Sequence, residues 1–437
     1  MLKMVLYLNY LHKKWEESMK AVGLVTEYNP LHNGHIYHIR QSMELTNADI
    51  CIAVMSGNFV QRGEPAIIDK YSRCQAAIDS GINLLVELPS YYALSSAEIF
   101  ADGAVKTLAA LGVNSMVFGS ECGDMSLLKE IAKLLVSEPE NYKKLLKKNL
   151  STGQTFPRAR QTALEQIMEQ PFDTLLSSPN NILGIEYLKA ILKRNAKITP
   201  YTLMRKGAGY HELEVDTKKA FSSAAAIREK IRQQTDKNFS DANCELFDNV
   251  IPDSMKNVLL NRLQLSAPIF LNDFTPLLNY KLLEICSECY QDKNLIAKRL
   301  SSYADITIEL GSRIAACFTG TDTFSELILK IKSRQYTYSR ISRCLMHILL
   351  NIQKTSAVRY EAAQAPYIRI LGFDKKGQKY LSSLKKNCDV PIITKTADYK
   401  ELLRDDIYCA SLYNQVVFQK YGYRLKDEFR QGVYIKR

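Results

Sequence analysis

Short apolar runs alternate with segments of helical periodicity from Ala21 onward, and this alternation most limits how the chain can fold. The runs are rich in β-branched residues and cover residues 21–28, 49–57, 82–89 and 113–121. Apolar positions at helical spacing mark the segments between them, which are 34–46, 69–81 and 95–112. Strands and helices in this order predict βαβ units and a parallel sheet. Ligands of such a sheet bind outside the carboxyl ends of its strands, so the residues just after each run are the first candidates for a site.

The secondary structure expected for the rest of the chain differs from this alternation. From about Asp124 the pattern turns helical, with a further strand and loop expected in residues 198–215. We expect the α/β domain to span residues 19–245, and residues 246–437 to be mainly helical with a small α/β tail. Residues 1–18 precede the regular pattern, and we interpret them as an N-terminal extension.

Composition excludes some classes of protein. No run approaches the roughly 18 uninterrupted apolar residues of a membrane span, so we expect no membrane partner. Apolar residues make up 46% of the chain, which excludes disorder as the main state. The cysteines are scattered singly except for Cys286 and Cys289, with no second pair at zinc spacing. We therefore expect packing cysteines and a reducing, cytoplasmic location.

Three of the six histidines, His32, His35 and His38, fall within seven residues. They follow the first predicted strand and begin the first predicted helix, where unpaired amides and the helix dipole favour an anion. Gly34 lets a phosphate approach the backbone there. Because His32 and His35 are three positions apart, both imidazoles could donate hydrogen bonds to one phosphate during attack at phosphorus. A metal site and plain helix packing are the alternatives.

A second phosphate-binding signal lies near the expected end of the α/β domain. Ser222 and Ser223 open a helix, and Arg228 follows about one turn later. Hydroxyls, unpaired amides and a guanidinium suit the β- and γ-phosphates of a nucleoside triphosphate, although an ordinary N-cap with a surface Arg has the same sequence. H-x-G-H after a first strand, paired with S-S-x-x-x-I-R, resembles the marks of the nucleotidylyltransferase superfamily. That resemblance implies a Rossmann-like domain in which the α-phosphate of a triphosphate is attacked.

Longer blocks of the sequence resemble one particular family within this superfamily. From Met19 to near the C-terminus, the chain is similar to the bacterial tRNA(Met) cytidine acetate ligase family in VGLVTEYNPLHNGHIYHI, MSGNFVQRGEPAIIDKYSRCQAA, PNNILGIEYLKA and SSAAAIR. The resemblance implies an enzyme that activates acetate with ATP to acetyl-adenylate and then acetylates N4 of the wobble cytidine of elongator tRNA(Met). The family pattern also implies a hydroxyl residue at one of the positions that Ala224 to Ala226 occupy here. We therefore expect Ser222 and Ser223 to supply this hydroxyl.

The same resemblance implies which residues hold ATP. The family's nucleotide loop falls on Val25, Thr26, Glu27, Tyr28, Asn29, Pro30, Leu31, His32, Asn33, Gly34, His35 and His38. Outside this loop it implies Gly119, Arg205 with Lys206, and one of the neighbours Asn180 and Asn181. We expect His32, His35 and Arg228 to be catalytic. We also expect Mg²⁺ to accompany the triphosphate, without a protein-bound metal cluster.

A polar loop follows the second predicted strand. It carries Ser56, Gly57, Asn58, Gln61 and Arg62, and the helix after it carries Lys70 and Arg73. Such a loop could bind a small carboxylate or the target base. A solvated connection followed by a charged helix face is the alternative.

Positive charge is concentrated in the second half of the chain. Residues 251–437 carry 29 cations and 18 anions, whereas residues 1–250 carry 29 and 28. The window between Glu326 and Glu361 has no acidic residue, and tyrosines are interleaved with its cations. Cations for phosphates and tyrosines for stacking suit a folded RNA, so we predict tRNA contacts at Lys332, Arg334, Arg340 and Arg343. Two alternatives remain. A small-molecule adenylyltransferase would not need this basic region. A non-catalytic RNA-binding protein would not need the clustered histidines.

Overall fold

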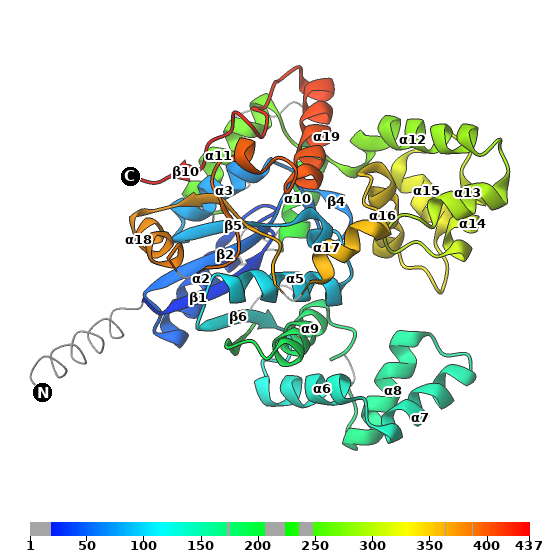
Figure 1. Cartoon of the computed structure of the whole chain (residues 1–437), viewed down its shortest axis with the longest axis horizontal. Helices are drawn as coiled ribbons and strands as arrows, with labels where there is room; N and C mark the ends of the chain where they lie inside the picture. The colour runs from blue at the N-terminus through cyan, green and yellow to red at the C-terminus, as the bar shows by residue number, and fades with distance from the viewer. Residues whose placement is uncertain are drawn as a thin grey trace, which may run out of the picture.

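The computed structural model describes residues 19–172, 175–205, 223–235, 247, 249–362, 364–386 and 388–437. Its centre is a mostly parallel sheet with helices on both faces, and two helical lobes lie beside it (Figure 1). The expected N-terminal extension, residues 1–18, lies outside the described residues. Among the helices that are described, none is long and apolar enough to cross a membrane.

The four predicted strands form the middle of the sheet. They are β1 (Ala21–Thr26), β2 (Ile50–Ser56), β5 (Leu84–Leu88) and β6 (Ser115–Ser120). β1 pairs with β2 and β6, β2 pairs with β5, and each pairing is parallel. The further strand expected after residue 198 is β7 (Thr199–Met204), parallel to β6. The prediction of a parallel-sheet α/β fold is confirmed, and the carboxyl ends of five strands meet at one edge.

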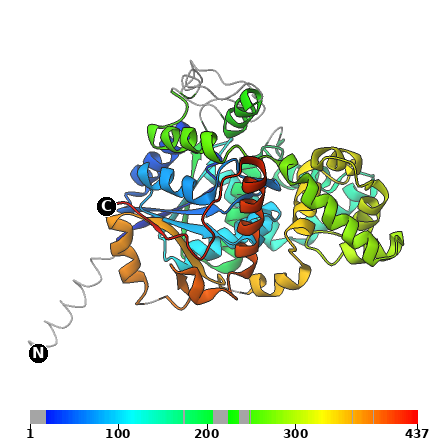
Figure 2. The same cartoon turned by 90° about the horizontal axis from the view of Figure 1, so that it is seen from above.

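Side chains alternate between the two faces of these strands, and each face has its own helices (Figure 2). Val22 and Leu24 belong to the core that contains residues of α2 (Asn33–Thr46), α3 (Lys70–Asp79) and α11 (Asp253–Leu265). Ala21 belongs to the opposite core, with residues of α5 (Ala97–Ala110), α9 (Pro179–Arg194) and α18 (Lys375–Leu384).

The small α/β tail expected within residues 246–437 joins the sheet of the α/β domain. β8 (Ile368–Phe373) pairs antiparallel with β5, and both β9 (Ile392–Ile393) and β10 (Tyr434–Ile435) pair with β8. The tail therefore extends the α/β sheet from beyond the expected boundary at residue 245. Periodicity could not reveal this, because an apolar run indicates a buried strand but not its pairing partner.

A buried charge cluster fixes this tail to the sheet. The Nζ atom of Lys70 lies 2.7 Å from a carboxylate oxygen of Glu87, and Arg369 of β8 lies 3.2 Å from the other. Glu428 pairs with both Lys70 and Arg369. Buried charges persist in proteins when they are paired in this way. The helix face that carries Lys70 is therefore neither solvated nor turned toward a ligand at this position, and these were the two possibilities left by its sequence.

Two helical lobes project from the α/β body (Figure 1). The first contains α6 (Met125–Ser137), α7 (Glu140–Ser151) and α8 (Phe156–Met168). The second contains α12 (Thr275–Glu288), α13 (Lys293–Leu300), α14 (Ile308–Cys317), α15 (Phe324–Ile331) and α16 (Tyr338–Leu349). The chain then returns to the sheet through α17 (Ala357–Glu361), and α19 (Arg404–Tyr421) precedes β10.

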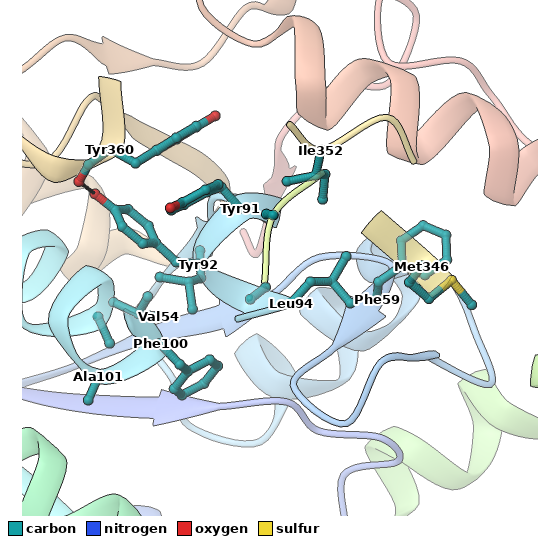
Figure 3. Close-up of a cluster of buried hydrophobic side chains, with 14 of the residues drawn as sticks. Val54, Phe59, Tyr91, Tyr92, Leu94, Phe100, Ala101, Met346, Ile352 and Tyr360 are labelled. Carbon is teal, nitrogen blue, oxygen red and sulfur yellow. Dashed lines mark hydrogen bonds between the residues drawn. The ribbon is translucent and has the colours of Figure 1, made fainter. Parts of the chain in front are cut away.

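A shared core fixes the second lobe to the α/β body (Figure 3). Tyr360 of α17 stacks on Tyr91 of α4 (Ser90–Ala93), with ring centroids 4.5 Å apart. Tyr92 donates a hydrogen bond from its hydroxyl to the carbonyl oxygen of Tyr360 at 2.6 Å. His347 of α16 is buried, with one ring nitrogen 2.9 Å from the carbonyl oxygen of Leu94. His347 therefore packs within this shared core.

Candidate active site

A buried arginine holds the loop between β1 and α2. Arg73 donates hydrogen bonds to the carbonyl oxygens of Glu27 at 2.6 Å and Ser56 at 3.1 Å, and also to that of Gly57. These carbonyls follow or end β1 and β2, so one guanidinium fixes the carboxyl ends of two strands. Arg73 was expected on a ligand-facing or solvated helix, but the structure shows it buried beneath the loop.

Two histidines cap α2 reciprocally. His32 is the N-cap residue, and its Nδ1 accepts a hydrogen bond from the backbone N–H of Gly34 at 3.1 Å. Nδ1 of His35 accepts one from the backbone N–H of His32 at 3.2 Å. A neutral imidazole that accepts at Nδ1 carries its proton at Nε2. Both rings therefore keep an Nε2–H donor at a helix N-terminus, where an anion is favoured.

Burial keeps these imidazoles neutral. It lowers the pKa of His32 to about 3 and the pKa of His35 well below its ordinary value, and the positive charge of Arg205 adds to both effects. Burial also lowers the pKa of His38 to about 4. Nε2 of His38 is buried and has no hydrogen-bond partner among the described residues. These rings can thus donate hydrogen bonds to an anion at neutral pH without first taking up a proton.

The second predicted phosphate-binding element lies against the same loop. Ser223 caps α10 (Ala224–Thr235), where its hydroxyl accepts a hydrogen bond from the backbone N–H of Ala226 at 3.1 Å. Arg228 donates from Nη1 to the carbonyl oxygen of Asn29 at 2.9 Å. This bond brings together the two motifs that the sequence separates by almost two hundred residues. Ser222 lies outside the described residues.

Asn180 and Asn181, which the sequence could not distinguish, have different surroundings. Asn181 is 2% exposed, and its side-chain oxygen accepts hydrogen bonds from the backbone N–H groups of Glu121 at 2.9 Å and Cys122 at 3.1 Å. Asn180 donates to the carboxylate of Glu121 at 2.6 Å and lines a cavity. Asn180 can therefore reach a ligand, whereas Asn181 shapes the loop after β6.

Gly119 and Arg205 lie beside Asn180 in the wall of the same cavity. A Cβ atom added to Gly119 would lie 3.4 Å from Cγ of Arg205. Arg205 donates from Nη1 to the side-chain oxygen of Asn180 at 3.4 Å. Lys206, which was predicted beside Arg205, lies outside the described residues.

These elements enclose a cavity of about 910 Å³ at the carboxyl edge of the sheet. Residues predicted from the sequence that line it are Val25, Thr26, Glu27, Tyr28, Asn29, His32, Gly34, His35, His38, Gly119, Asn180, Arg205, Ser223 and Arg228. Pro30, Leu31 and Asn33 lie behind this wall; Leu31 is in the core, and the side chain of Asn33 donates to the carbonyl oxygen of Asn249 at 2.7 Å. A cavity of this size suits a ligand as large as a nucleotide. Among the described residues, no group of three or more His, Cys, Asp or Glu side chains could hold a metal ion.

The second lobe forms the opposite wall of the same cavity. Its contribution comes from Lys332, Ser333, Thr337, Tyr338, Ser339 and Arg343. α16 lies on the hairpin of β3 (Phe59–Val60) and β4 (Glu64–Pro65), where Ser342 donates to the carbonyl oxygen of Gly63 at 2.7 Å. The sequence of this window predicts RNA contacts and gives no indication that the window lines the cavity. A single sequence carries no signal that pairs α16 with a hairpin so far away in the chain.

The four cations predicted to contact RNA differ in exposure. Lys332 and Arg334 are exposed. Arg340 is half-buried, and its Nη2 lies 3.2 Å from the carboxylate of Asp305. Arg343 is only 8% exposed and faces the same carboxylate. The window that has no acidic residue in the sequence therefore has an acidic neighbour in space.

Comparisons with known proteins identify the family to which this chain belongs. The HIGH Nucleotidyl Transferase family model matches residues 19–428. Proteins named tRNA(Met) cytidine acetate ligase from Caldanaerobacter subterraneus subsp. tengcongensis and Thermoanaerobacter sp. are 40% and 41% identical to this chain over 404 residues. Each alignment covers 90% of this chain and 95% of the relative.

Two solved structures share the fold over nearly the whole chain. The apo crystal structure of Thermotoga maritima TmcAL has a TM-score of 0.84 at 30% identity, covering 96% of this chain and 100% of that one. The structure of the same protein bound with alpha-thio ATP has a TM-score of 0.83, with the same identity and coverage. The chain therefore belongs to the tRNA(Met) cytidine acetate ligase family, within the HIGH nucleotidyl transferases.

Proposed function

We propose that this protein is an ATP-dependent ligase that activates acetate as acetyl-adenylate and acetylates N4 of the wobble cytidine of elongator tRNA(Met). Relatives named for tRNA(Met) and cytidine acetate ligation support the substrates, and the likeness to TmcAL bound with alpha-thio ATP supports the nucleotide. The observation that carries the chemistry is the pair of Nε2–H donors that the reciprocal caps of His32 and His35 leave available at one helix end.

In the first half-reaction, an acetate oxygen attacks the α-phosphorus of ATP, and the bond from this phosphorus to pyrophosphate breaks. Negative charge develops on the α-phosphate oxygens and on the departing pyrophosphate. His32 and His35 would donate hydrogen bonds to the α-phosphate, since donors fixed in advance stabilise charge as it develops. Ser223 and Arg228 would hold the pyrophosphate, because a helix N-terminus and a guanidinium both favour phosphate.

The two opposite walls of the cavity would bind different substrates. Gly119, Asn180 and Arg205 would bind the adenosine side of ATP. Mg²⁺ would arrive with the triphosphate and neutralise part of its charge, as Mg²⁺ does where it is bound mainly by phosphates and water. The second lobe would bind tRNA, with Lys332 and Arg334 exposed beside the cavity. The catalytic unit would then be residues 19–245 with the C-terminal strands added. Because the proposed substrate is a tRNA, the reaction would take place in the cytoplasm.

Labelled acetate tests this function. The protein is incubated with ATP and labelled acetate, with and without tRNA(Met), and the products are separated. We expect AMP, pyrophosphate and labelled N4-acetylcytidine in the tRNA, with label in tRNA only when ATP is present. Release of ADP, or unlabelled tRNA after complete ATP turnover, would contradict the proposal. Adenylation of a small molecule in place of acetate would support the alternative of a small-molecule adenylyltransferase.

A further inference from the structure

Glu27 lies between the two walls of the cavity. Its backbone follows β1, and its carbonyl oxygen is held by Arg73. Oε1 of its carboxylate accepts a hydrogen bond from the backbone N–H of Gln61 at 2.8 Å, so the side chain turns toward the β3–β4 hairpin. Among the described residues, none donates a hydrogen bond to Oε2 of Glu27, and the side chain lines the cavity. One carboxylate oxygen is thus fixed, and the other is available to a ligand.

The hairpin and α16 form a polar and aromatic pocket wall next to this carboxylate. Gln61 is the link, because its N–H binds Glu27 and its carbonyl oxygen accepts from Arg343 of α16 at 3.4 Å. Tyr338, in the first turn of α16, lines the same cavity and is half-buried. Unstacked RNA bases bind to proteins by stacking on aromatic rings and by hydrogen bonds to their Watson–Crick edge. A carboxylate accepts hydrogen bonds from the 4-amino group of cytosine.

We propose that this wall receives the target base and that Glu27 accepts the proton which the cytidine amino group loses during acetyl transfer. The inference rests on the proposed function, since it concerns the second half-reaction of that ligase. Glu27 is then a catalytic residue for transfer, whereas the histidines serve adenylate formation. Uracil has a carbonyl oxygen in place of the 4-amino group, so a carboxylate at this position also favours cytosine.

The transfer step balances without a further reactant. The amino nitrogen attacks the acyl carbon of acetyl-adenylate, and a C–N bond forms. The bond between the acyl carbon and the phosphate oxygen breaks, and AMP leaves with the electron pair. One amino proton moves to Oε2 of Glu27. Burial raises the pKa of this carboxyl group, against the opposing charges of Arg228, Arg62 and Arg73. A carboxylate with a raised pKa is a better proton acceptor near neutral pH.

Glu27→Gln separates this role from a structural one. The amide oxygen of Gln can still accept the hydrogen bond from Gln61, so the loop keeps its anchor, but the side chain can no longer take up a proton. Acetyl-adenylate is first formed on the enzyme from ATP and labelled acetate. tRNA(Met) is then added, and labelled cytidine is followed in a single turnover. We expect acetyl transfer from the preformed acetyl-adenylate to fall about 100-fold or more, a larger factor than any fall in acetate-dependent exchange of pyrophosphate into ATP.

A matched variant and a pH profile complete the test. Glu64→Gln removes the other carboxylate of the hairpin wall and is expected to reduce transfer much less than Glu27→Gln. Wild-type transfer should rise with pH as Glu27 ionises, and the Glu27→Gln variant should lack this rise. Unchanged transfer in Glu27→Gln, or exchange and transfer that fall by the same factor, would overturn the assignment. A wild-type enzyme without acetate-dependent exchange would instead refute the proposed function.

Discussion

The backbone N–H of His32 donates a hydrogen bond to Nδ1 of His35, 3.2 Å away. Together with the bond from Gly34 to Nδ1 of His32, it fixes the tautomers of both rings through the backbone of the helix they cap. Both histidines of the motif H-x-G-H therefore have a structural role, and the proposed function adds a chemical one. Each ring satisfies an amide at the helix end and still has one donor for a phosphate.

Because His32 is buried and neutral, its titration should weaken the fold in acid. Its folded pKa of about 3 lies below the ordinary value of 6.5, so the unfolded state binds more protons between these values. Stability is thus present above about pH 6.5 and is lost as the pH falls toward 3. From pH 7 to pH 5 the loss due to this group is about 2 kcal/mol.

His32→Asn measures this contribution. Asn is a good N-cap and can keep the hydrogen bond from Gly34. Urea unfolding of the wild type and of the variant at pH 7 and pH 5 should show that the variant loses about 2 kcal/mol less. Equal losses in the two proteins would mean that His32 titrates normally in the folded state.

The neighbours Asn180 and Asn181 should give opposite phenotypes. Asn181→Ala leaves two backbone N–H groups of the loop after β6 without their acceptor, which costs about 1 to 3 kcal/mol in thermal or urea unfolding. Asn180→Ala removes a side chain from the cavity wall, and it should weaken ATP binding in a calorimetric titration with little change in stability. If Asn181→Ala were as stable as the wild type and Asn180→Ala bound ATP normally, the roles drawn from their surroundings would be wrong.

The exposed cations beside the cavity should hold tRNA through its phosphates. The double variant Lys332→Ala and Arg334→Ala is expected to bind tRNA more weakly. The slope of log affinity against log salt should also fall by about 0.7 for each phosphate that the variant no longer neutralises. Acetate-dependent exchange should not change, because it needs no tRNA. Lys379→Ala is the control, because Lys379 is exposed on α18, and α18 lies away from this lobe in Figure 1. Unchanged tRNA binding by the double variant at moderate salt would exclude this surface.

The sequence predicted the parallel sheet and the nucleotide loop because both depend on local signals. β-branched runs and helical periodicity are readable in a short window, and H-x-G-H lies in one turn. The return of β8 to the sheet brings together the buried charges of Glu87, Arg369 and Glu428, which are far apart in the chain. No local pattern indicates such pairing.

The candidate site also depends on contacts between distant segments, which the sequence alone does not indicate. The loop at Glu27 and the helix at Arg228 were both recognised, but the wall formed by Tyr338 and Gln61 depends on how α16 docks on the hairpin. The sequence also does not indicate which cations are exposed to solvent. Arg343 is buried beside Asp305, although the window that contains Arg343 has no acidic residue. Which cations face solvent is decided by tertiary packing.

The exchange of labelled pyrophosphate into ATP, in the presence of acetate and without tRNA, tests the central claim most directly. It reports attack of acetate on the α-phosphorus at the histidine pair. We predict exchange by the wild-type protein only when acetate is present, and loss of this exchange in His35→Ala while tRNA binding persists. Undiminished exchange in His35→Ala, or wild-type exchange that does not depend on acetate, would contradict the account.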